Sequence, residues 1–222
     1  MIVTIDGPAA AGKSTAARAL AERLGFDFLD TGAMYRAVTL AALRRKIPLD
    51  NEQALEKLAA SLKIELRGKA VLLDGEDVSV AIRDVEVTKH SRNVADNPGV
   101  RRQMVLLQRE AGRSHNIVAE GRDQGTVVFP DAACKFFLTA APTVRAERRQ
   151  VDLAKRGLHI TVDQVLADQN ERDDRDASRA IAPMVPASDA IHVDSSHMSL
   201  TDVVDSLERR VRQVQSHESQ IA

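Results

Sequence analysis

Aromatic residues are scarce in this chain, which has five Phe, one Tyr and no Trp among 222 residues. Proteins that bind single-stranded nucleic acid usually stack bases on aromatic rings. Acidic and basic residues are balanced, with a formal net charge of −1, whereas dedicated nucleic-acid binders are usually basic. We therefore expect no polynucleotide partner.

Long apolar runs and cysteines are also nearly absent. No stretch approaches the ~20 apolar residues of a membrane-spanning helix, and the first residues already indicate a strand, so we expect neither a leader nor a membrane partner. The single cysteine, Cys134, excludes an internal disulfide and is typical of a reducing, cytoplasmic compartment. Cys134 lies in a largely apolar run, 133–138, where a buried, inert thiol is favoured over a nucleophile.

A glycine-rich motif follows the first apolar run. It has the spacing G-x-x-x-x-G-K-[S/T] and consists of Gly7, Pro8, Ala9, Ala10, Ala11, Gly12, Lys13, Ser14 and Thr15. The two glycines let backbone N–H groups converge on phosphate oxygens where a helix begins. Lys13 would place a positive charge between the β- and γ-phosphates of ATP, and the Ser14 hydroxyl would bind Mg²⁺. A turn that binds nothing is disfavoured, because a predicted strand (2–5) and helix (14–24) flank the motif as it requires.

Helical and strand patterns alternate along the chain, which predicts an α/β fold with a parallel sheet of about five strands covered on both faces. Strands are expected at 2–5, 26–29, 116–119, 127–129, 134–139 and 190–194, and helices at 14–24, 30–46, 50–60, 142–155 and 199–213, with others beginning at Pro98 and at the capping box 161–164. Residues 62–80 instead predict a small antiparallel sheet. We expect a single domain, 1–222, with a core (1–61, 97–147 and 180–222), an insert that forms a mobile flap (62–96), and a short lid with its following helix (148–179).

Polar residues follow two predicted strands, at the edge where open α/β sheets bind ligands. Thr31 and Arg36 follow the strand 26–29, although Thr31 could equally cap the next helix and Arg36 could be solvated. Arg122 and Asp123 follow the strand 116–119, and there a site is favoured over a solvated turn. Arg101 lies in the first turn of the helix that begins at Pro98, where a cation opposes the helix dipole and indicates an anionic ligand nearby.

A predicted helix near residue 175 carries several arginines on one face. Since successive residues are ~100° apart, one third of its circumference holds Arg172, Arg175, Asp176 and Arg179. An ion-paired surface is the alternative, because Asp173 and Asp174 are adjacent. Beside a phosphate cradle, however, guanidinium groups suit phosphate oxygens and the charge that develops in phosphoryl transfer.

The P-loop fold by itself does not choose among GTPases, ATPases, kinases and sulfotransferases. An N-K-x-D guanine motif is missing, as is a run of four apolar residues that ends in a Mg²⁺-ordering Asp. Two rival classes are a nucleotide-triggered binding module and a scaffold that has lost its nucleotide. The arginine-rich second site argues against the first, and intact Lys13 and Ser14 argue against the second.

Five segments make nearly the whole chain resemble the bacterial-type cytidylate kinases, which use ATP to make CDP or dCDP from CMP or dCMP. The segments are Asp6-Gly7-Pro8 with the glycine loop, Asp30-Thr31-Gly32-Ala33-Met34-Tyr35-Arg36, Pro98-Gly99-Val100-Arg101, the run 120–130 from Glu120 to Pro130, and Glu171-Arg172-Asp173-Asp174-Arg175-Asp176. The insert also resembles the enlarged monophosphate-binding region of this family. The resemblance implies a three-layer P-loop NTPase fold that uses ATP and Mg²⁺; a broad-specificity UMP/CMP kinase is the runner-up. Because the acceptor phosphate is already a nucleophile, we expect direct in-line transfer. We also expect a monomer.

The resemblance also implies roles for particular residues. It assigns the monophosphate to Thr31, Arg36, Arg101, Arg122, Asp123, Arg172, Asp176 and Arg179, and catalysis to Lys13 with the lid arginines Arg148, Arg149 and Arg175. Arginines suit the α-phosphate, while Asp123 could accept from the cytosine amino group and Asp176 from sugar hydroxyls. One position departs from the family, because Arg92 stands where a serine near cytosine is usual. Either the preceding Ser91 takes over that contact or it is lost.

Overall fold

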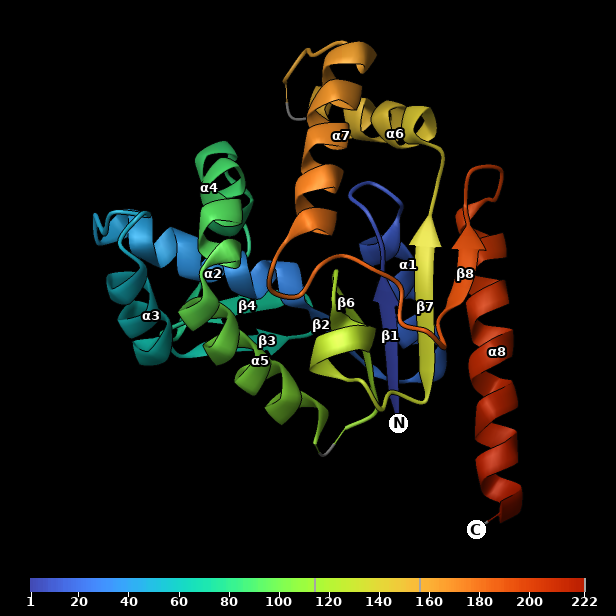
Figure 1. Cartoon of the computed structure of the whole chain (residues 1–222). Coiled ribbons are helices and arrows are strands. Elements are labelled where there is room, and N and C mark those ends of the chain that lie inside the picture. The colour runs from blue at the N-terminus through green and yellow to red at the C-terminus, as the bar shows by residue number, and fades with distance from the viewer. Residues whose placement is uncertain (114, 156, 222) are drawn as a thin grey trace. The chain divides into compact units, whose positions relative to one another are not determined.

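The computed structural model describes residues 1–113, 115–155 and 157–221 of the chain. Backbone contacts divide the chain into two compact units, one of Met1–Phe28 with Asn116–Ala222 and one of Leu29–His115 (Figure 1). The first unit contains the glycine loop and the predicted lid. The second contains the small antiparallel sheet and four helices.

The larger unit is organised around a parallel sheet in the order β2-β6-β1-β7-β8. Its strands are β1 (Ile2–Asp6), β2 (Asp27–Asp30), β6 (Ile117–Glu120), β7 (Cys134–Thr139) and β8 (Ile191–Asp194). Val3 on the central strand lies opposite Val118 on one side and Cys134 on the other. Because Ile5 lies opposite Glu120, β1 and β6 end together at one edge of the sheet.

Two helices, α1 (Lys13–Leu24) and α8 (Leu200–Ile221), pack against each other and share one apolar core with the sheet. Leu20, Phe136 and Leu207 are almost completely buried in this core. Full burial of one such side chain stabilises the folded protein by about 1.5–3 kcal/mol. Gly25, in a left-handed conformation, ends α1, and its N–H points back to the carbonyls of Ala21 and Glu22. The core thus holds α1, and the loop before it, against the sheet.

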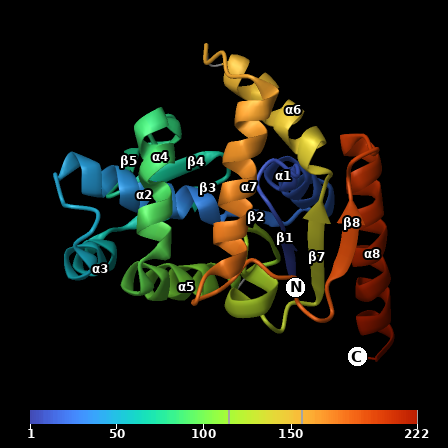
Figure 2. The same cartoon turned by 45° about the horizontal axis from the view of Figure 1, so that its top comes forward.

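Helices α6 (Pro142–Ala154) and α7 (Val162–Ser178) lie against each other (Figure 2). The lid region predicted at 148–179 contains the second half of α6 and all of α7. The capping box predicted at 161–164 is confirmed: the Thr161 hydroxyl accepts from the Gln164 N–H, and the Gln164 side chain accepts from the Thr161 N–H. These two bonds satisfy N–H groups that would otherwise be unpaired at the start of α7.

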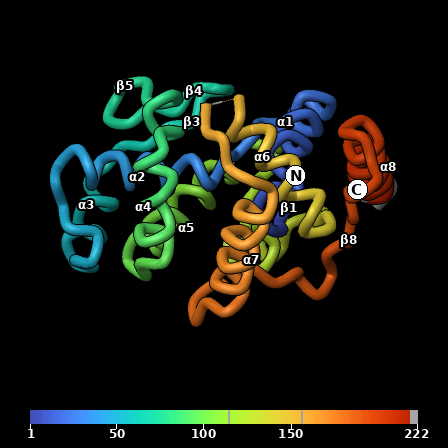
Figure 3. The backbone as a smooth tube through the Cα atoms, turned by 90° about the horizontal axis from the view of Figure 1, so that it is seen from above, coloured from blue at the N-terminus to red at the C-terminus, as the bar shows by residue number. Residues whose placement is uncertain are grey.

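The smaller unit contains α2 (Thr31–Arg44), α3 (Glu52–Ser61), α4 (Val85–Asp96), α5 (Pro98–Gly112) and the 3-10 turn η1 (Ala81–Arg83). Its antiparallel sheet has the order β3 (Ile64–Arg67), β4 (Ala70–Leu73) and β5 (Glu76–Asp77). Figure 3 shows α2 and α4 side by side, as their contacts require. The antiparallel sheet predicted in 62–80 is therefore confirmed.

The predicted fold class, α/β with a five-stranded parallel sheet and an antiparallel element, is confirmed. Among the described residues, no helix is both long and apolar enough to cross a bilayer. Cys134 is buried in β7, as expected of an inert thiol.

Three local predictions are wrong. Residues 127–129 form no strand, because Gln124–Val128 is a π-helix, η2, in which the Phe129 N–H donates to the Gln124 carbonyl at 2.7 Å. Val128 and Phe129 are buried, and a short buried apolar run has the same sequence pattern in either structure. The third antiparallel strand is 76–77, within a predicted turn, and α8 continues beyond residue 213 to Ile221.

Candidate active site

The glycine loop between β1 and α1 approaches the sheet closely. Gly7 has φ of +139°, and a Cβ at this position would lie 2.1 Å from the Leu138 carbonyl oxygen, so only glycine fits. Gly12 also has a positive φ and occupies the cap position of α1. No cap side chain therefore covers the N–H groups of the first turn, which, together with the helix dipole, favour an anion.

Lys13 is the first residue of α1 and lies inside the loop. Its Nζ donates to the Pro8 carbonyl at 2.7 Å, and only 5% of the residue is exposed. Burial lowers the pKa of Lys13 to about 7, and the positive charges of Arg122 and Arg172 add to this effect against the opposing charges of Glu120 and Asp6. A phosphate ligand would supply the negative charge that favours protonated Lys13.

Ser14 meets a carboxylate that sequence reasoning had not assigned to the site. Its Oγ donates to Glu120 Oε1 at 2.7 Å, and Glu120 is the buried last residue of β6. The signal in the sequence is the apolar run 117–119 followed by an acid, which is one residue shorter than a run of four and ends in Glu rather than Asp. A hydroxyl and a carboxylate suit a hard divalent cation that also binds nucleotide phosphates and water.

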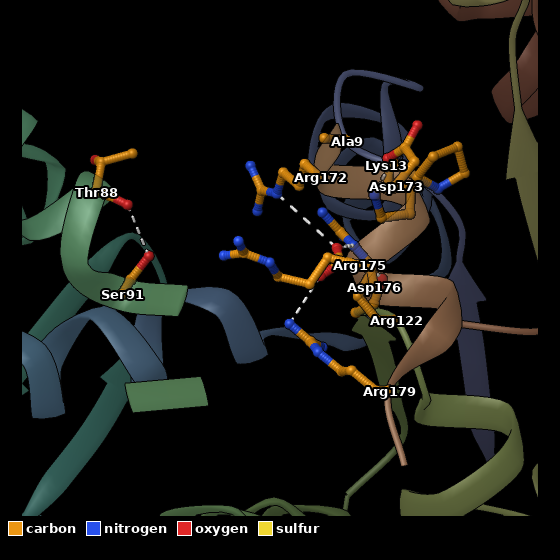
Figure 4. A network of polar contacts seen from close by, with 12 residues as sticks. Ala9, Lys13, Thr88, Ser91, Arg122, Arg172, Asp173, Arg175, Asp176 and Arg179 are labelled. Atoms are coloured by element: carbon orange, nitrogen blue, oxygen red, sulfur yellow. Dashed lines mark hydrogen bonds and ion pairs between the residues drawn. The ribbon is translucent and has the colours of Figure 1, made fainter. Parts of the chain in front are cut away.

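Asp176 on α7 gathers three of the predicted monophosphate-binding arginines. Figure 4 shows Arg122, Arg172 and Arg179 around its carboxylate. The Arg122 Nε lies 3.1 Å and the Arg172 Nε 3.9 Å from Oδ2, and the Arg179 Nη2 lies 2.7 Å from Oδ1. Burial would raise the pKa of Asp176, but the three guanidinium groups outweigh it and hold that pKa below its usual range.

The arginine cluster and the glycine loop therefore belong to one electrostatic environment. Arg122 and Arg172 both act on the pKa of Lys13. Such a concentration of positive charge around one carboxylate is suited to polyanionic ligands. The ion pairs of the alternative interpretation are present, but they surround Asp176, which is only 3% exposed and so does not lie on a solvated surface.

Asp123 follows Arg122 and directly precedes η2. It is 5% exposed, and its charge raises the pKa of the neighbouring Asp6. The two N–H groups after it, those of Gln124 and Gly125, donate to the Asp6 carboxylate. Arg122 and Asp123 therefore lie on a turn attached to the end of β1.

The other predicted lid arginines differ in their surroundings. Arg148 on α6 donates to the Oγ and carbonyl oxygen of Ser195 at 3.0 and 2.7 Å, and Ser195 Oγ in turn donates to the loop carbonyl of Ala11. Arg149 is half-buried on the same helix. Arg175 is half-exposed and lies 3.5 Å from Glu171, one turn earlier on α7.

Arg145 is a second residue that sequence reasoning did not assign to the site. It is 5% exposed, and its Nη1 donates both to the loop carbonyl of Ala9 at 3.2 Å and to Asp173 Oδ2 at 2.5 Å. Arg145 thus joins α6, α7 and the glycine loop. In the sequence, the only signal for Arg145 is that it lies on the same helix as Arg148 and Arg149, one turn earlier.

Thr31, Arg36 and Arg101 lie in the smaller unit. Thr31 does not cap α2, because Asp30 is the cap and its Oδ1 accepts from the Ala33 N–H at 2.8 Å. Arg36 donates weakly to the same oxygen at 3.5 Å. Arg101 is buried, donates to the Ala95 carbonyl at 3.2 Å and lies with its guanidinium carbon 5.7 Å from the ring centre of Tyr35.

Ser91 and Arg92 lie on α4 of the smaller unit. The Ser91 Oγ donates to the Thr88 carbonyl at 2.9 Å, one turn earlier (Figure 4). Arg92 is half-buried on the same helix. The two alternatives for the cytosine contact both stay predictions.

Known proteins resemble this chain over most of its length. A family model described as cytidylate kinase matches residues 3–213. A cytidylate kinase of Rhodopirellula baltica is 47% identical over 213 residues, which cover 96% of this chain and 93% of that protein. A cytidylate kinase of Shewanella pealeana is 44% identical over 210 residues, covering 92% and 91% of the two chains.

Among solved structures, a gluconokinase from Sinorhizobium meliloti has a TM-score of 0.51 and 16% identity, with 98% of this chain and 95% of that chain covered. At this low identity the likeness supports the fold alone.

Proposed function

This chain belongs to the cytidylate kinase family, and from that premise we propose that it transfers the γ-phosphate of ATP to CMP or dCMP. It is an ATP-dependent nucleoside-monophosphate kinase. The observation that carries the site assignment is the contact between the glycine loop and α7: Arg145 donates both to the Ala9 carbonyl and to Asp173, which follows Arg172. It combines a phosphate cradle with the guanidinium groups of a second anion site.

The proposed reaction is direct and in line. An oxygen of the monophosphate attacks the γ-phosphorus while the bond to the β–γ bridging oxygen breaks and ADP leaves. The acceptor is already ionised, so positioning and charge neutralisation suffice and no general base is needed. Residues 7–15 hold the ATP phosphates, with Lys13 at the β- and γ-oxygens.

Of the remaining residues, we propose that some bind the nucleoside monophosphate and others the ATP phosphates. Arg122, Arg172 and Arg179 bind the acceptor phosphate, Asp176 accepts from the sugar hydroxyls, and Asp123 from the cytosine amino group. On the sequence resemblance alone, Thr31, Arg36 and Arg101 also bind the monophosphate. Arg148, Arg149 and Arg175 act on the ATP phosphates from a lid at 148–179, while residues 62–96 act as a flap.

Mg²⁺ is the proposed divalent cation, with the Ser14 hydroxyl as its ligand and Glu120 beside it. Mg²⁺ keeps several waters and needs only one or two protein oxygens when phosphates complete its shell. When bound, it would neutralise charge on the transferring phosphate.

Glu120→Gln is expected to raise the Mg²⁺ concentration needed for half-maximal activity by roughly tenfold or more. The amide keeps the size of the side chain but lacks the charge that holds a cation and its waters. Activity measured against free Mg²⁺ at saturating ATP tests this. Glu208→Gln is the matched control, because Glu208 pairs with Arg23 and Arg212 on the surface. An unchanged Mg²⁺ curve in Glu120→Gln would remove Glu120 from the metal site.

ADP formation from ATP, Mg²⁺ and each nucleoside monophosphate in turn tests the proposed function. CMP and dCMP should give the highest kcat/KM, and no label should remain on the protein after incubation with γ-labelled ATP. A stable phosphoprotein would exclude direct transfer.

The proposed enzyme works in the cytoplasm, in keeping with its free, buried Cys134. It is proposed to work as a monomer without polynucleotide or membrane partners.

A further inference from the structure

Asp6 is a buried carboxylate that neither the glycine motif nor the proposed reaction uses. It is the last residue of β1, directly before Gly7, and is 4% exposed. Its Oδ1 accepts from the Gln124 N–H at 2.9 Å and its Oδ2 from the Gly125 N–H at 2.7 Å. One side chain thus joins the start of the phosphate loop to a segment 118 residues away.

The segment that Asp6 holds is the turn that carries Arg122 and Asp123. The π-helix η2 begins directly after Asp123, so the two N–H groups bound by Asp6 are the first two of η2. Arg122 in turn reaches Asp176, where its Nε lies 3.1 Å from Oδ2. The placement of both predicted acceptor-binding residues therefore depends on how this turn is attached to β1.

Gly125 allows the close attachment. A Cβ at this position would lie 3.0 Å from the Thr4 Oγ1, 3.3 Å from the Lys135 Cδ and 3.4 Å from the Asp6 Oδ2. A larger residue would therefore crowd these three side chains, including the Asp6 carboxylate that holds the turn. The close approach thus depends both on the small size of Gly125 and on the two acceptor oxygens of Asp6.

Burying an ionised carboxylate at this position lowers the stability of the folded protein. Its presence there indicates that its two acceptor oxygens are needed. Burial is the largest influence on Asp6 and raises its pKa to about 6, although the N–H groups of Gly125 and Gln124 and the charge of Lys13 lower it. When the pKa of an acid is higher in the folded than in the unfolded protein, its ionised form at neutral pH destabilises the folded state. Only the carboxylate, however, offers two acceptor oxygens without a donor.

We propose that Asp6 is a positioning residue for the acceptor nucleotide: it holds the Gln124 and Gly125 N–H groups so that Arg122 and Asp123 face the monophosphate. The proposal rests on the proposed function of Arg122 and Asp123. It assigns Asp6 no contact with either substrate. Its positioning effect is on the acceptor side of the reaction, whereas its charge also favours protonated Lys13 in the adjoining ATP loop.

The test is Asp6→Asn, in which one N–H keeps an acceptor while the other faces an amide donor. We expect the KM for CMP to rise about tenfold or more, since an unpaired buried group is costly. The KM for ATP should rise less, because the only loss on that side is the charge of Asp6 that favours protonated Lys13. Hydrogen exchange at the Gln124 and Gly125 amides should quicken at least about tenfold, and that of residues 7–15 should not. Asp205→Asn, at an exposed ion pair with Arg23, is the matched control and should behave as wild type.

A second variant keeps the test decisive if Asp6→Asn folds poorly. Gly125→Ala keeps the carboxylate but adds a Cβ 3.4 Å from the Asp6 Oδ2 and 3.0 Å from the Thr4 Oγ1. By crowding the same contact it should reproduce the selective rise in the KM for CMP. The proposal is overturned if the KM for ATP rises as much as that for CMP, or if both variants bind CMP as wild type does. Wild-type activity on CMP, measured in parallel, tests the proposed function separately.

Discussion

Lys13→Ala is expected to lower kcat by roughly 100- to 1,000-fold while changing the KM for CMP by less than about threefold. The Lys13 Nζ lies within the phosphate loop, where its charge would meet the β- and γ-oxygens rather than the acceptor. An interaction that strengthens as charge moves to the leaving group lowers the barrier more than it tightens binding. Steady-state kinetics with each substrate varied in turn measures the two effects separately.

Two controls show whether the effect of Lys13→Ala comes from the lost charge of Lys13, from its lost volume, or from the loss of any lysine. Lys13→Met fills most of the same buried space and should lose as much activity as Lys13→Ala, whereas Lys57→Ala, at an exposed position on α3, should lose none. Unchanged ATP-dependent kinetics in Lys13→Ala would refute the loop assignment.

The lowered pKa of Lys13 gives a further readout of the same assignment. At pH 8.5 the free protein should hold Lys13 mostly neutral, since burial brings its pKa to about 7, and nucleotide phosphates, with a second pKa near ~6, are already ionised. ATP phosphates favour the charged amine, so ATP binding should take up as much as about one proton. Calorimetry in buffers of different ionisation enthalpy measures this uptake, which Lys13→Met should lack.

CMP is expected to be preferred over UMP by at least roughly tenfold in kcat/KM, and Asp123→Asn should narrow that gap. Cytosine has an amino donor at position 4 where uracil has a carbonyl acceptor. Asp123 is 5% exposed, and a carboxylate that faces this edge of the base would pair with the amino group and repel the carbonyl. An asparagine amide can rotate to donate to uracil, which explains the expected loss of selectivity.

The measurement is kcat/KM for CMP, dCMP and UMP in wild type and Asp123→Asn. Asp131→Asn is the control, because Asp131 is exposed in the loop before β7. Equal wild-type values for CMP and UMP would replace the cytidylate assignment with a broad UMP/CMP kinase. An unchanged preference in Asp123→Asn would instead move base recognition to another residue, with Ser91 and Arg92 the next to test.

The sequence by itself determined the features that depend on neighbouring residues. The order strand, glycine loop and helix at 2–24 follows from β-branched residues, glycines at the two tight positions and a helix-forming run. The alternation of strands with helices likewise determined the parallel sheet. The capping box at 161–164 is also local, and the structure has it as predicted.

Only the tertiary structure decided which distant residues meet. Ser14 and Glu120 are 106 residues apart, and their contact follows from the pairing of β1 with β6, which no local pattern specifies. The run 127–129 was mistaken for a strand because a short buried apolar run fits a strand or a helical turn equally well. In the structure, the first two N–H groups of η2 donate to Asp6, at the end of another strand. Long-range polar partners such as these determine backbone geometry without leaving a periodic signal in the sequence.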